Sequence, residues 1–508
     1  EIHSGDWSSD VCSSDLMSII LMMKIADFIG LNKRGQLITG VLVAGIPMAI
    51  LQSSSTQNDL VVGFFCLAFA FFMLKVVKTG SWEDVLFASL ALGFALLTKG
   101  TGYIFCAGIG LGIAGVYLIG LDWSEIKKKL IQFSVIVLSA LVISTGHFAR
   151  NIQLYNHPLS TENSRITADS YSTKSMFSNL VRNGAVHLAT PIPAGNDLLN
   201  RAVLNLLGDQ INNPDSTFGG TEFQVSFSLN EDSSGNLLHF VFLAAAASGL
   251  IFRRKRISKE ETAIWISMLL GVILFNLLLK WQPWGTRLQA PLFMLGSVLI
   301  GSFIAEIAGK SWLNIIVVGI LLIFSLPFLL LNTTRPVLPL FTSDSQVSQN
   351  RAVMYLGNKI DKFFLKHPGL SENLKPVRSL FYDGRSILYT KRKRLYFLSN
   401  FSYFYDYAEA KNEIEKYSVS EIGLLMDSND WEYPIWVLLG RKGTQGLPEI
   451  NHIMVKDVSR KYDTAGNELP PLIVATAKDS DGVLSGQEYS IVYEADSIQV
   501  LVDPELLK

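Results

Sequence analysis

Long uncharged runs of apolar residues fill most of residues 17–331, and they constrain this chain more than any other feature. Runs of about 15 to 22 such residues are long enough to cross a bilayer as a helix. We expect about ten of them, the first being the remnant of a longer span. They lie at residues 17–30, 37–51, 60–77, 84–98, 101–121, 130–149, 238–252, 262–279, 288–306 and 312–331. The sequence therefore predicts a mainly α-helical, polytopic transmembrane bundle.

The positive charges between these runs predict which loops face the cytoplasm. Basic residues occur at residues 32–34, 75–78, 127–129 and 253–259. Counting the runs places all four loops on one side of the membrane, and the positive-inside rule makes that side cytoplasmic. The outer side then carries the 52–59 turn, the turn at Lys99, a large loop at 150–237, the 280–287 turn and everything after residue 331. We therefore expect a multi-pass protein of the plasma membrane.

Residues 332–508 have the composition of a soluble protein and lie outside by the same count. They mix a helix-like stretch at 407–417 with β-like runs at 422–426, 435–439, 473–476 and 490–493. This alternation predicts an extracytoplasmic α/β domain after the membrane domain at 17–331. The net charge of −1 and the absence of a basic patch interleaved with aromatics give no indication of nucleic-acid binding.

The first sixteen residues, EIHSGDWSSDVCSSDL, are polar and rich in Ser and Asp. They lack the basic region and the apolar stretch of a signal peptide. They are similar to translated sequencing-adapter sequence, and apolar sequence begins abruptly at Met17. We expect residues 1–16 to be a non-native leader and the natural N-terminus to be missing, so this segment is left out of the predicted fold.

Asp59 is the most informative polar residue, because it ends the octet QSSSTQND between two apolar runs. Ionisable groups near membrane depth often face a cavity and act chemically. Lys99, Arg150 and Arg287 fall at the same outer side, as does Trp284. Cations beside Asp59 suggest an anionic ligand such as a lipid-linked phosphate. The alternatives stay open: Asp59 as a helix cap, the cations reaching lipid headgroups, and tryptophan in an interfacial belt.

The outer loop at 150–237 has a pattern of its own. Residues 175–207 carry apolar residues at helical spacing, which predicts an amphipathic pair lying on the interface or packing on the bundle. Glu231 and Asp232 precede the next run. Such acidic side chains suit sugar hydroxyls or a divalent ion, and a solvated loop is the alternative.

Five stretches together resemble one superfamily. They are ILQSSSTQND at 50–59, ALLTKGTG at 95–102, ARNIQLYNHP at 149–158, NEDSSGNLLH at 230–239 and WGTRLQAP at 284–291. Their order resembles the GT-C superfamily of integral-membrane glycosyltransferases that use polyprenyl-phosphate-linked sugars. The nearest likeness is to bacterial relatives of the dolichyl-phosphate-mannose protein mannosyltransferases, glycosyltransferase family 39.

The resemblance implies transfer of a hexose or pentose from a polyprenyl-phosphate donor to a glycan, lipid or protein acceptor on the outer side. It makes Asp59 the second acidic residue of the site. The principal base, an Asp of the first external loop, is expected to be missing here, so this chain is expected to be inactive. Lys99, Arg150 and Arg287 are candidates to stabilise the leaving phosphate, with Trp284, Glu231 and Asp232 as further substrate-binding candidates. No cofactor is implied with certainty, and a divalent cation stays open.

Three other functions compete with this interpretation. A transporter or flippase for lipid-linked sugars would place its polar residues near mid-membrane rather than at outer ends. An O-antigen polymerase or ligase shares a large external loop, but it gives no reason for a soluble domain after the last span. A non-catalytic scaffold is the third alternative.

Overall fold

A computed structural model describes residues 6–55, 57–160, 165–253, 257–307 and 311–338, together with residue 366 and most of residues 386–508. The gaps in the last range are 389, 399, 401, 428–429, 440–447, 456–457, 463–468, 477–483 and 485–488. The chain divides into two compact units, residues 1–384 and 385–508. Apart from residue 366, the stretch 339–384 of the predicted soluble domain lies outside the described residues.

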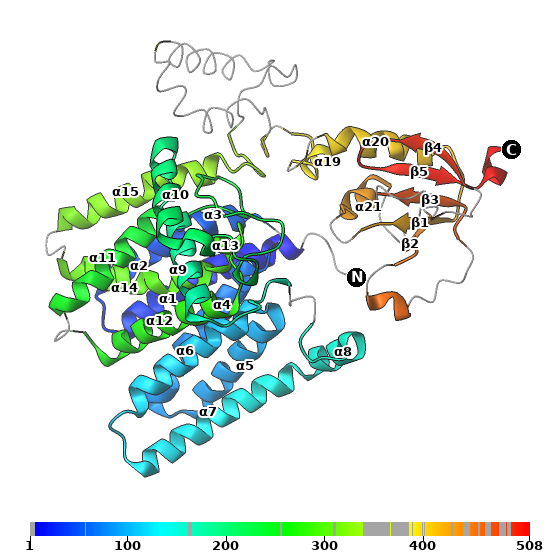
Figure 1. Ribbon diagram of the computed structural model, residues 1–508. Coiled ribbons are helices and arrows are strands. Elements are labelled where there is room, and N and C mark those ends of the chain that lie inside the picture. The colour runs from blue at the N-terminus through cyan, green and yellow to red at the C-terminus, as the bar shows by residue number, and fades with distance from the viewer. Residues whose placement is uncertain are drawn as a thin grey trace. The chain divides into compact units, whose positions relative to one another are not determined.

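Unit 1 is helical, and each predicted apolar run falls on a helix or a pair of helices (Figure 1). The helices are α1 (Asp6–Phe28), α2 (Lys33–Ala44), α3 (Pro47–Gln52), α4 (Asp59–Thr79), α5 (Trp82–Thr98), α6 (Thr101–Leu118), α7 (Trp123–Ile143), α8 (Thr145–Tyr155), α9 (Thr173–His187), α10 (Pro193–Leu207), α11 (Leu237–Arg253), α12 (Lys259–Leu278), α13 (Gly285–Leu288), α14 (Ala290–Ile307) and α15 (Ser311–Leu330). Two short 3₁₀ turns follow α10, at Gly208–Gln210 and Pro214–Ser216.

Length and apolarity qualify four described helices as membrane spans on their own: α4, α6, α12 and α14. The pair α7 and α8, bent by 54° at a short break, makes a fifth if counted as one span. Helix α11 and residues 314–330 of α15 are shorter apolar helices. The predicted mainly α-helical membrane architecture is confirmed.

One predicted span differs from the sequence-based expectation, and one segment without a prediction is helical. The predicted single span at 37–51 is broken into α2 and α3, because Pro47 lacks an N–H and holds Ile46 in an extended conformation. Helix α1 begins at Asp6. It therefore includes residues 6–16, for which the sequence made no structural prediction.

Local signals explain where the membrane helices begin and end. The side chains of Ser81, Asp122 and Ser258 each accept a hydrogen bond from a backbone N–H in the first turn of α5, α7 and α12. Helix α4 ends at Gly80, whose φ of 69° closes the helix in the left-handed conformation that glycine tolerates. All four caps lie at one end of the bundle, where α4 ends and α5, α7 and α12 begin.

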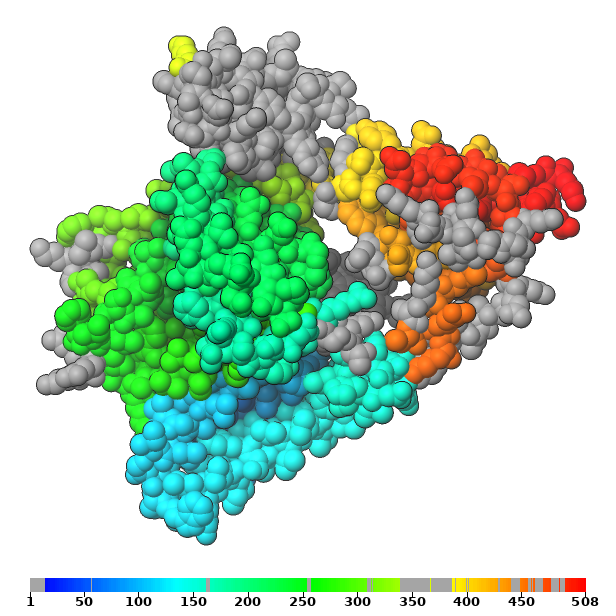
Figure 2. Space-filling view, viewed as in Figure 1, coloured from blue at the N-terminus to red at the C-terminus, as the bar shows by residue number. Residues whose placement is uncertain are grey.

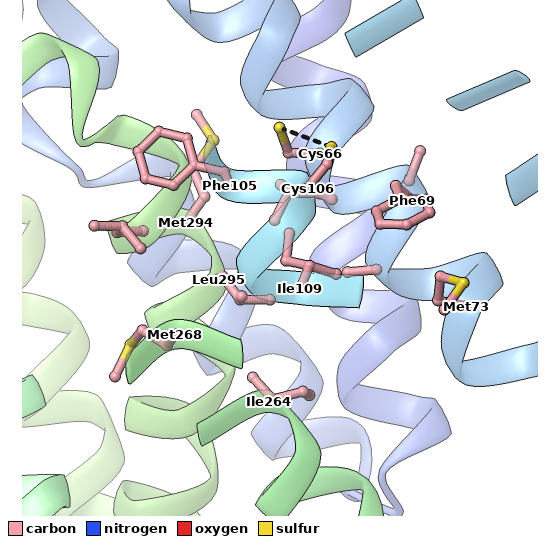
Figure 3. Packing of buried hydrophobic residues seen from close by; sticks show 14 of the residues in the cluster. Cys66, Phe69, Met73, Phe105, Cys106, Ile109, Ile264, Met268, Met294 and Leu295 are labelled. Atoms are coloured by element: carbon pink, nitrogen blue, oxygen red, sulfur yellow. Dashed lines mark hydrogen bonds between the residues drawn. The ribbon is translucent and has the colours of Figure 1, made fainter. Parts of the chain in front are cut away.

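The core of unit 1 lies among α4, α6, α12 and α14 (Figure 3). Helices α6 and α12 approach closely through Gly112, where an added Cβ would lie 2.5 Å from the backbone of Ser267. Phe105 and Phe275 stack at 5.9 Å across the same pair. Cys66 and Cys106 are buried in this core, and their sulfurs lie 3.7 Å apart.

The predicted amphipathic pair in the long loop is confirmed as α9 and α10. Figure 2 shows their atoms, in green, gathered in one continuous surface region of unit 1. Arg182 of α9 is fully buried and donates hydrogen bonds to Asn179, Ile211, Ser216 and Thr217. Its guanidinium lies 5.4 Å from the centre of the Trp281 ring. This arginine therefore joins α9 to the loop at 208–217 and to the turn after α12.

Unit 2 contains helices and a five-stranded mixed sheet, which matches the predicted α/β class. The order is β2-β1-β3-β5-β4, with β1, β2 and β3 parallel and β5 antiparallel to both of its neighbours. The elements are α19 (Arg392–Leu395), α20 (Tyr403–Ile414), β1 (Glu421–Leu425), α21 (Tyr433–Leu439), β2 (Glu449–His452), a 3₁₀ turn (Val458–Tyr462), β3 (Leu472–Ala475), β4 (Ser490–Glu494), β5 (Gln499–Val502) and a 3₁₀ turn (Pro504–Leu507).

One β-like run in unit 2 was predicted wrongly. Residues 435–439 form part of helix α21 rather than a strand. Pro434 lies in the first turn of this helix, where its missing N–H costs nothing and its fixed φ suits the helix. Short apolar runs are ambiguous between strand and helix, and here the proline decides.

Candidate active site

Asp59 is buried at the first turn of α4, with a side chain 1% exposed. The residue at the cap position is Asn58, and no side chain caps the helix. The alternative that Asp59 is the helix cap is therefore wrong. Its carboxylate instead pairs with Lys99, whose Nζ lies 2.6 Å from Oδ1. The negative charge at the start of a helix is also favoured by the helix dipole.

Lys99 and Arg287 reach Asp59 from two different turns. Lys99 ends α5 in an extended conformation, and Asn58 Nδ2 donates to Thr98 O at 2.9 Å, which ties the two turns together. Arg287 comes from the four-residue helix α13, between α12 and α14. The sequence placed these three residues at one side of the membrane, and the structure brings them into one cluster.

The contact between Asp59 and Arg287 leaves two hydrogen-bonding atoms unused. Arg287 Nε lies 3.8 Å from Asp59 Oδ2, too far for a hydrogen bond. Both atoms are buried, and neither has a hydrogen-bond partner among the described residues. Buried polar atoms are nearly always paired. This pair of unsatisfied atoms therefore marks a place where a ligand would gain hydrogen bonds.

Asp232 and Glu231 extend the cluster toward solvent. Asp232 forms an ion pair with Arg287 and accepts a hydrogen bond from Gln57 Nε2 at 2.7 Å. Arg287 also donates to Gln57 Oε1 at 2.6 Å. Glu231 pairs with Arg335, beyond the end of α15. The Asp232 side chain is 48% exposed, which makes it the open edge of the cluster.

A cavity of about 660 Å³ adjoins Lys99. Its wall is mostly apolar and comes from the ends of α5 and α12, from the start of α6, from α8 and from residues 157–160 and 166–171. Polar groups on the wall include Lys99, His147, Asn151 and His157. Small-molecule sites have this size and this mixture of an apolar wall with few polar groups.

Arg150 and Trp284 lie outside this cluster. Arg150 is exposed on α8 and forms no ion pair within the described residues. Trp284 is half-buried and packs edge-to-face on Phe218, with ring centres 5.0 Å apart. Their roles in substrate binding stay predictions that the geometry does not strengthen.

Sequence reasoning missed Gln57 and Arg335 as members of the cluster. Gln57 stands two residues before Asp59 in the quoted octet, so its proximity could have been found. Arg335 is the first cation after the last apolar run, and only the fold shows that it pairs with Glu231. Among the described residues, no group of three His, Cys, Asp or Glu side chains is placed to hold a metal ion.

His187, a buried histidine of α9, connects several segments near the cluster. His187 accepts a hydrogen bond at Nδ1 from the backbone N–H of Asn236, and its Nε2 lies 3.3 Å from Gln289 Oε1. Asn236 Oδ1 in turn accepts from the backbone N–H of Met48. Complete burial lowers the pKa of His187 to about 4. The imidazole therefore joins α9, α3 and the segment after Arg287 without adding charge.

This burial predicts loss of stability in acid. Above pH 6.5, His187 is neutral in both the folded and the unfolded chain and has no effect. Between pH 6.5 and 4 the unfolded chain binds the proton and the folded chain does not, which costs up to about 3 kcal/mol. Thermal unfolding in detergent should show a smaller acid loss for His187→Gln than for wild type. The exposed His157→Gln serves as the control, and identical profiles for wild type and His187→Gln would contradict the prediction.

Known proteins resemble this chain both in sequence and in fold. Residues 7–147 match the family model described as dolichyl-phosphate-mannose-protein mannosyltransferase. Among solved structures, ArnT from Cupriavidus metallidurans bound to undecaprenyl phosphate aligns over 97% of this chain and 83% of its own, with a TM-score of 0.50 and 15% identity. The chain has a GT-C fold. The resemblance stated from the sequence is confirmed.

The apo state of the same ArnT aligns with the same coverage and identity and a TM-score of 0.47. At 15% identity the match to the lipid-bound structure concerns the fold alone. No curated protein matches the chain in sequence.

Proposed function

We propose that this GT-C protein transfers a sugar from a polyprenyl-phosphate-linked donor to an acceptor hydroxyl at the outer face of the membrane. The observation that carries the proposal is the buried carboxylate of Asp59 between Lys99 and Arg287, beside the 660 Å³ cavity. The match to the mannosyltransferase family over residues 7–147 and the GT-C fold support a membrane glycosyltransferase with a lipid-linked donor.

The cavity fits the two chemical halves of such a donor. Leu96, Leu97 and Leu278 give it an apolar wall suited to isoprenoid carbon, and Lys99 supplies a cation at its edge. When the bond from sugar to phosphate breaks, negative charge grows on the leaving phosphate. A preorganised cation in a site with little water stabilises that charge most effectively.

Arg287 would bind the same phosphate by exchanging partners. Its present partner Asp232 is about half exposed, so that carboxylate can move into solvent at low cost. The unpaired Nε of Arg287 offers a further donor. Asp59 is then the positioning residue, because it stays buried and fixes both cations. Asp232 is the exposed edge of the cluster, and once released from Arg287 it could accept a hydrogen bond from an acceptor hydroxyl that enters there.

The distribution of charge indicates on which face of the membrane the candidate active site lies. Asp59 and Lys99 lie at one end of the bundle, whereas Lys78 pairs with Glu260 at the other end. That other end also carries the basic residues at 32–34 and 127–129. By the positive-inside rule we place the basic end in the cytoplasm and the candidate active site on the extracytoplasmic face. Unit 2 would then also be extracytoplasmic.

Asp59→Asn tests the proposed roles by separating binding from transfer. The change keeps the size of the side chain and removes the charge that orients Lys99 and Arg287. With the principal base of the first external loop supplied, we expect transfer from a polyprenyl-phosphate sugar to fall about 100- to 1,000-fold, as when one transition-state contact is lost. Binding of undecaprenyl phosphate should stay equal or tighten, because the two cations lose their competing carboxylate.

Asp84→Asn is the matched control. Asp84 is also a buried carboxylate that pairs with a lysine, Lys75, at 2.5 Å, but it lies at the opposite end of the bundle. It should leave transfer and binding of undecaprenyl phosphate unchanged. Equal loss of transfer in both variants would show a general structural effect and would contradict the role given to Asp59.

A further inference from the structure

The end of the bundle opposite the candidate active site carries a second cationic hollow. Helix α4 has 21 residues, so its two ends are about 30 Å apart. At the far end, a cavity of about 220 Å³ lies between the ends of α4 and α6 and the starts of α7 and α12. Four of its lining residues are lysines: Lys78, Lys128, Lys129 and Lys259. This hollow is separate from the cavity beside Lys99.

The positive charge of this hollow is only partly balanced. Lys78 pairs with Glu260 at 3.1 Å, and Lys129 Nζ donates to the carbonyl oxygen of Val76 at 2.8 Å. Lys259 lies 4.8 Å above the ring of Tyr117. Lys128 is exposed and forms no ion pair within the described part of the chain. Glu125 also lines the hollow. The four ammonium groups still exceed the two carboxylates, Glu125 and Glu260, and an anion placed among the lysines would be held by several at once.

Two exposed tryptophans place this hollow at a membrane surface. Trp82 and Trp123, at the starts of α5 and α7, are 59% and 65% exposed. Both line a shallow hollow of about 430 Å³ with Lys127, Lys128 and Ile131, and Lys128 lines the lysine hollow as well. Lys127 Nζ lies 5.4 Å from the centre of the Trp123 ring. Tryptophan prefers the level of the lipid headgroups. The connection between α6 and α7 also projects at one edge of unit 1 (Figures 1 and 2).

We propose that this end of the bundle binds the headgroup of an anionic phospholipid, with its phosphate among Lys78, Lys128 and Lys259. Basic pockets between transmembrane helices at the cytoplasmic side bind such headgroups. The general excess of lysine on inner loops explains the charge, but it does not explain a cavity that gathers four lysines from three helices, α4, α7 and α12, beside Tyr117. The apolar side of the neighbouring hollow, Trp82, Trp123 and Ile131, would contact the glycerol and the first carbons of the acyl chains.

The test is the concentration of phosphatidylglycerol that stabilises the full chain against heat in a neutral detergent, since a ligand that binds the folded state raises the unfolding midpoint. Lys128→Gln with Lys259→Gln should need about thirtyfold more lipid, which corresponds to about 2 kcal/mol or about one per lysine. Lys24→Gln with Arg34→Gln is the control, because it removes two exposed cations near the same end but away from the hollow. This control should behave as wild type.

Several outcomes would overturn the proposal. One is stabilisation of wild type by phosphatidylcholine as strong as that by phosphatidylglycerol. Another is equal stabilisation by inorganic phosphate alone, which would make the hollow a site for a soluble anion. An equal loss in the control pair would mean that only general charge is involved. If the double variant does not fold, Lys128→Gln alone decides, because its exposed side chain supports no described contact; it should need several-fold more lipid.

Discussion

The double variant Lys99→Gln, Arg287→Gln is expected to bind undecaprenyl phosphate at least about 100-fold more weakly than wild type. Each cation would make a charge-assisted hydrogen bond to the phosphate, worth about 1.5 to 3 kcal/mol. Two such bonds lost from a partly buried site correspond to about 3 kcal/mol or more, hence the factor of 100. Equilibrium binding of the labelled lipid to purified protein measures the change directly.

A pair of cations elsewhere in the same outer region provides the control. Lys280 pairs with Asp169 at 2.6 Å, and Arg201 is exposed on α10. Neither lines the cavity of about 660 Å³. Lys280→Gln with Arg201→Gln should bind undecaprenyl phosphate as wild type does. Equal weakening in both double variants would mean that only the net charge of this face attracts the lipid.

Arg182→Met should lower the free energy of unfolding by about 3 to 5 kcal/mol. The guanidinium is fully buried and donates five hydrogen bonds. Methionine keeps most of the side-chain volume but leaves the carbonyl oxygens of Ile211 and Ser216 without these donors. Breaking a buried charged network from one side has this order of cost. Thermal or denaturant unfolding of the protein in detergent measures it.

Two further variants separate the hydrogen-bond network from simple charge. Arg182→Lys keeps the charge but cannot donate in several directions from one plane, so it should lose stability almost as severely. Arg201→Met removes an exposed arginine from the neighbouring helix and should change stability by less than about 0.5 kcal/mol. Full stability of Arg182→Lys would show that charge alone matters.

The membrane part of this fold could be predicted because the bilayer imposes its own length scale on the sequence. Every predicted apolar run falls on helix in unit 1. Counting spans also placed Asp59, Lys99 and Arg287 at one end, and the structure brings all three together. Counting spans predicts the end of the bundle at which a residue lies. It does not predict the side of the helix from which its side chain projects. For that reason Arg150, on α8 beyond the bend that follows α7, lies at the predicted end of the bundle but is exposed and is not part of the cluster.

Other features depend on contacts between segments far apart in sequence. Arg335 pairs with Glu231, and no periodicity connects two residues 104 positions apart. The break between α2 and α3 could have been read from Pro47, but a strongly apolar window hid it. In unit 2, the run at 435–439 is apolar enough for either a strand or a helix, and Pro434 decides for helix.

The central claim is that Lys99 and Arg287, held by Asp59, form the phosphate-binding centre of the GT-C unit. The most direct test is a structure of this protein with undecaprenyl phosphate bound. We predict the phosphate oxygens at about 3 Å from Lys99 Nζ and from the Arg287 guanidinium. The polyprenyl chain should enter the cavity lined by Leu96 and Leu278. A phosphate bound elsewhere, with the ion pairs of Lys99 and Arg287 unchanged, would contradict the account.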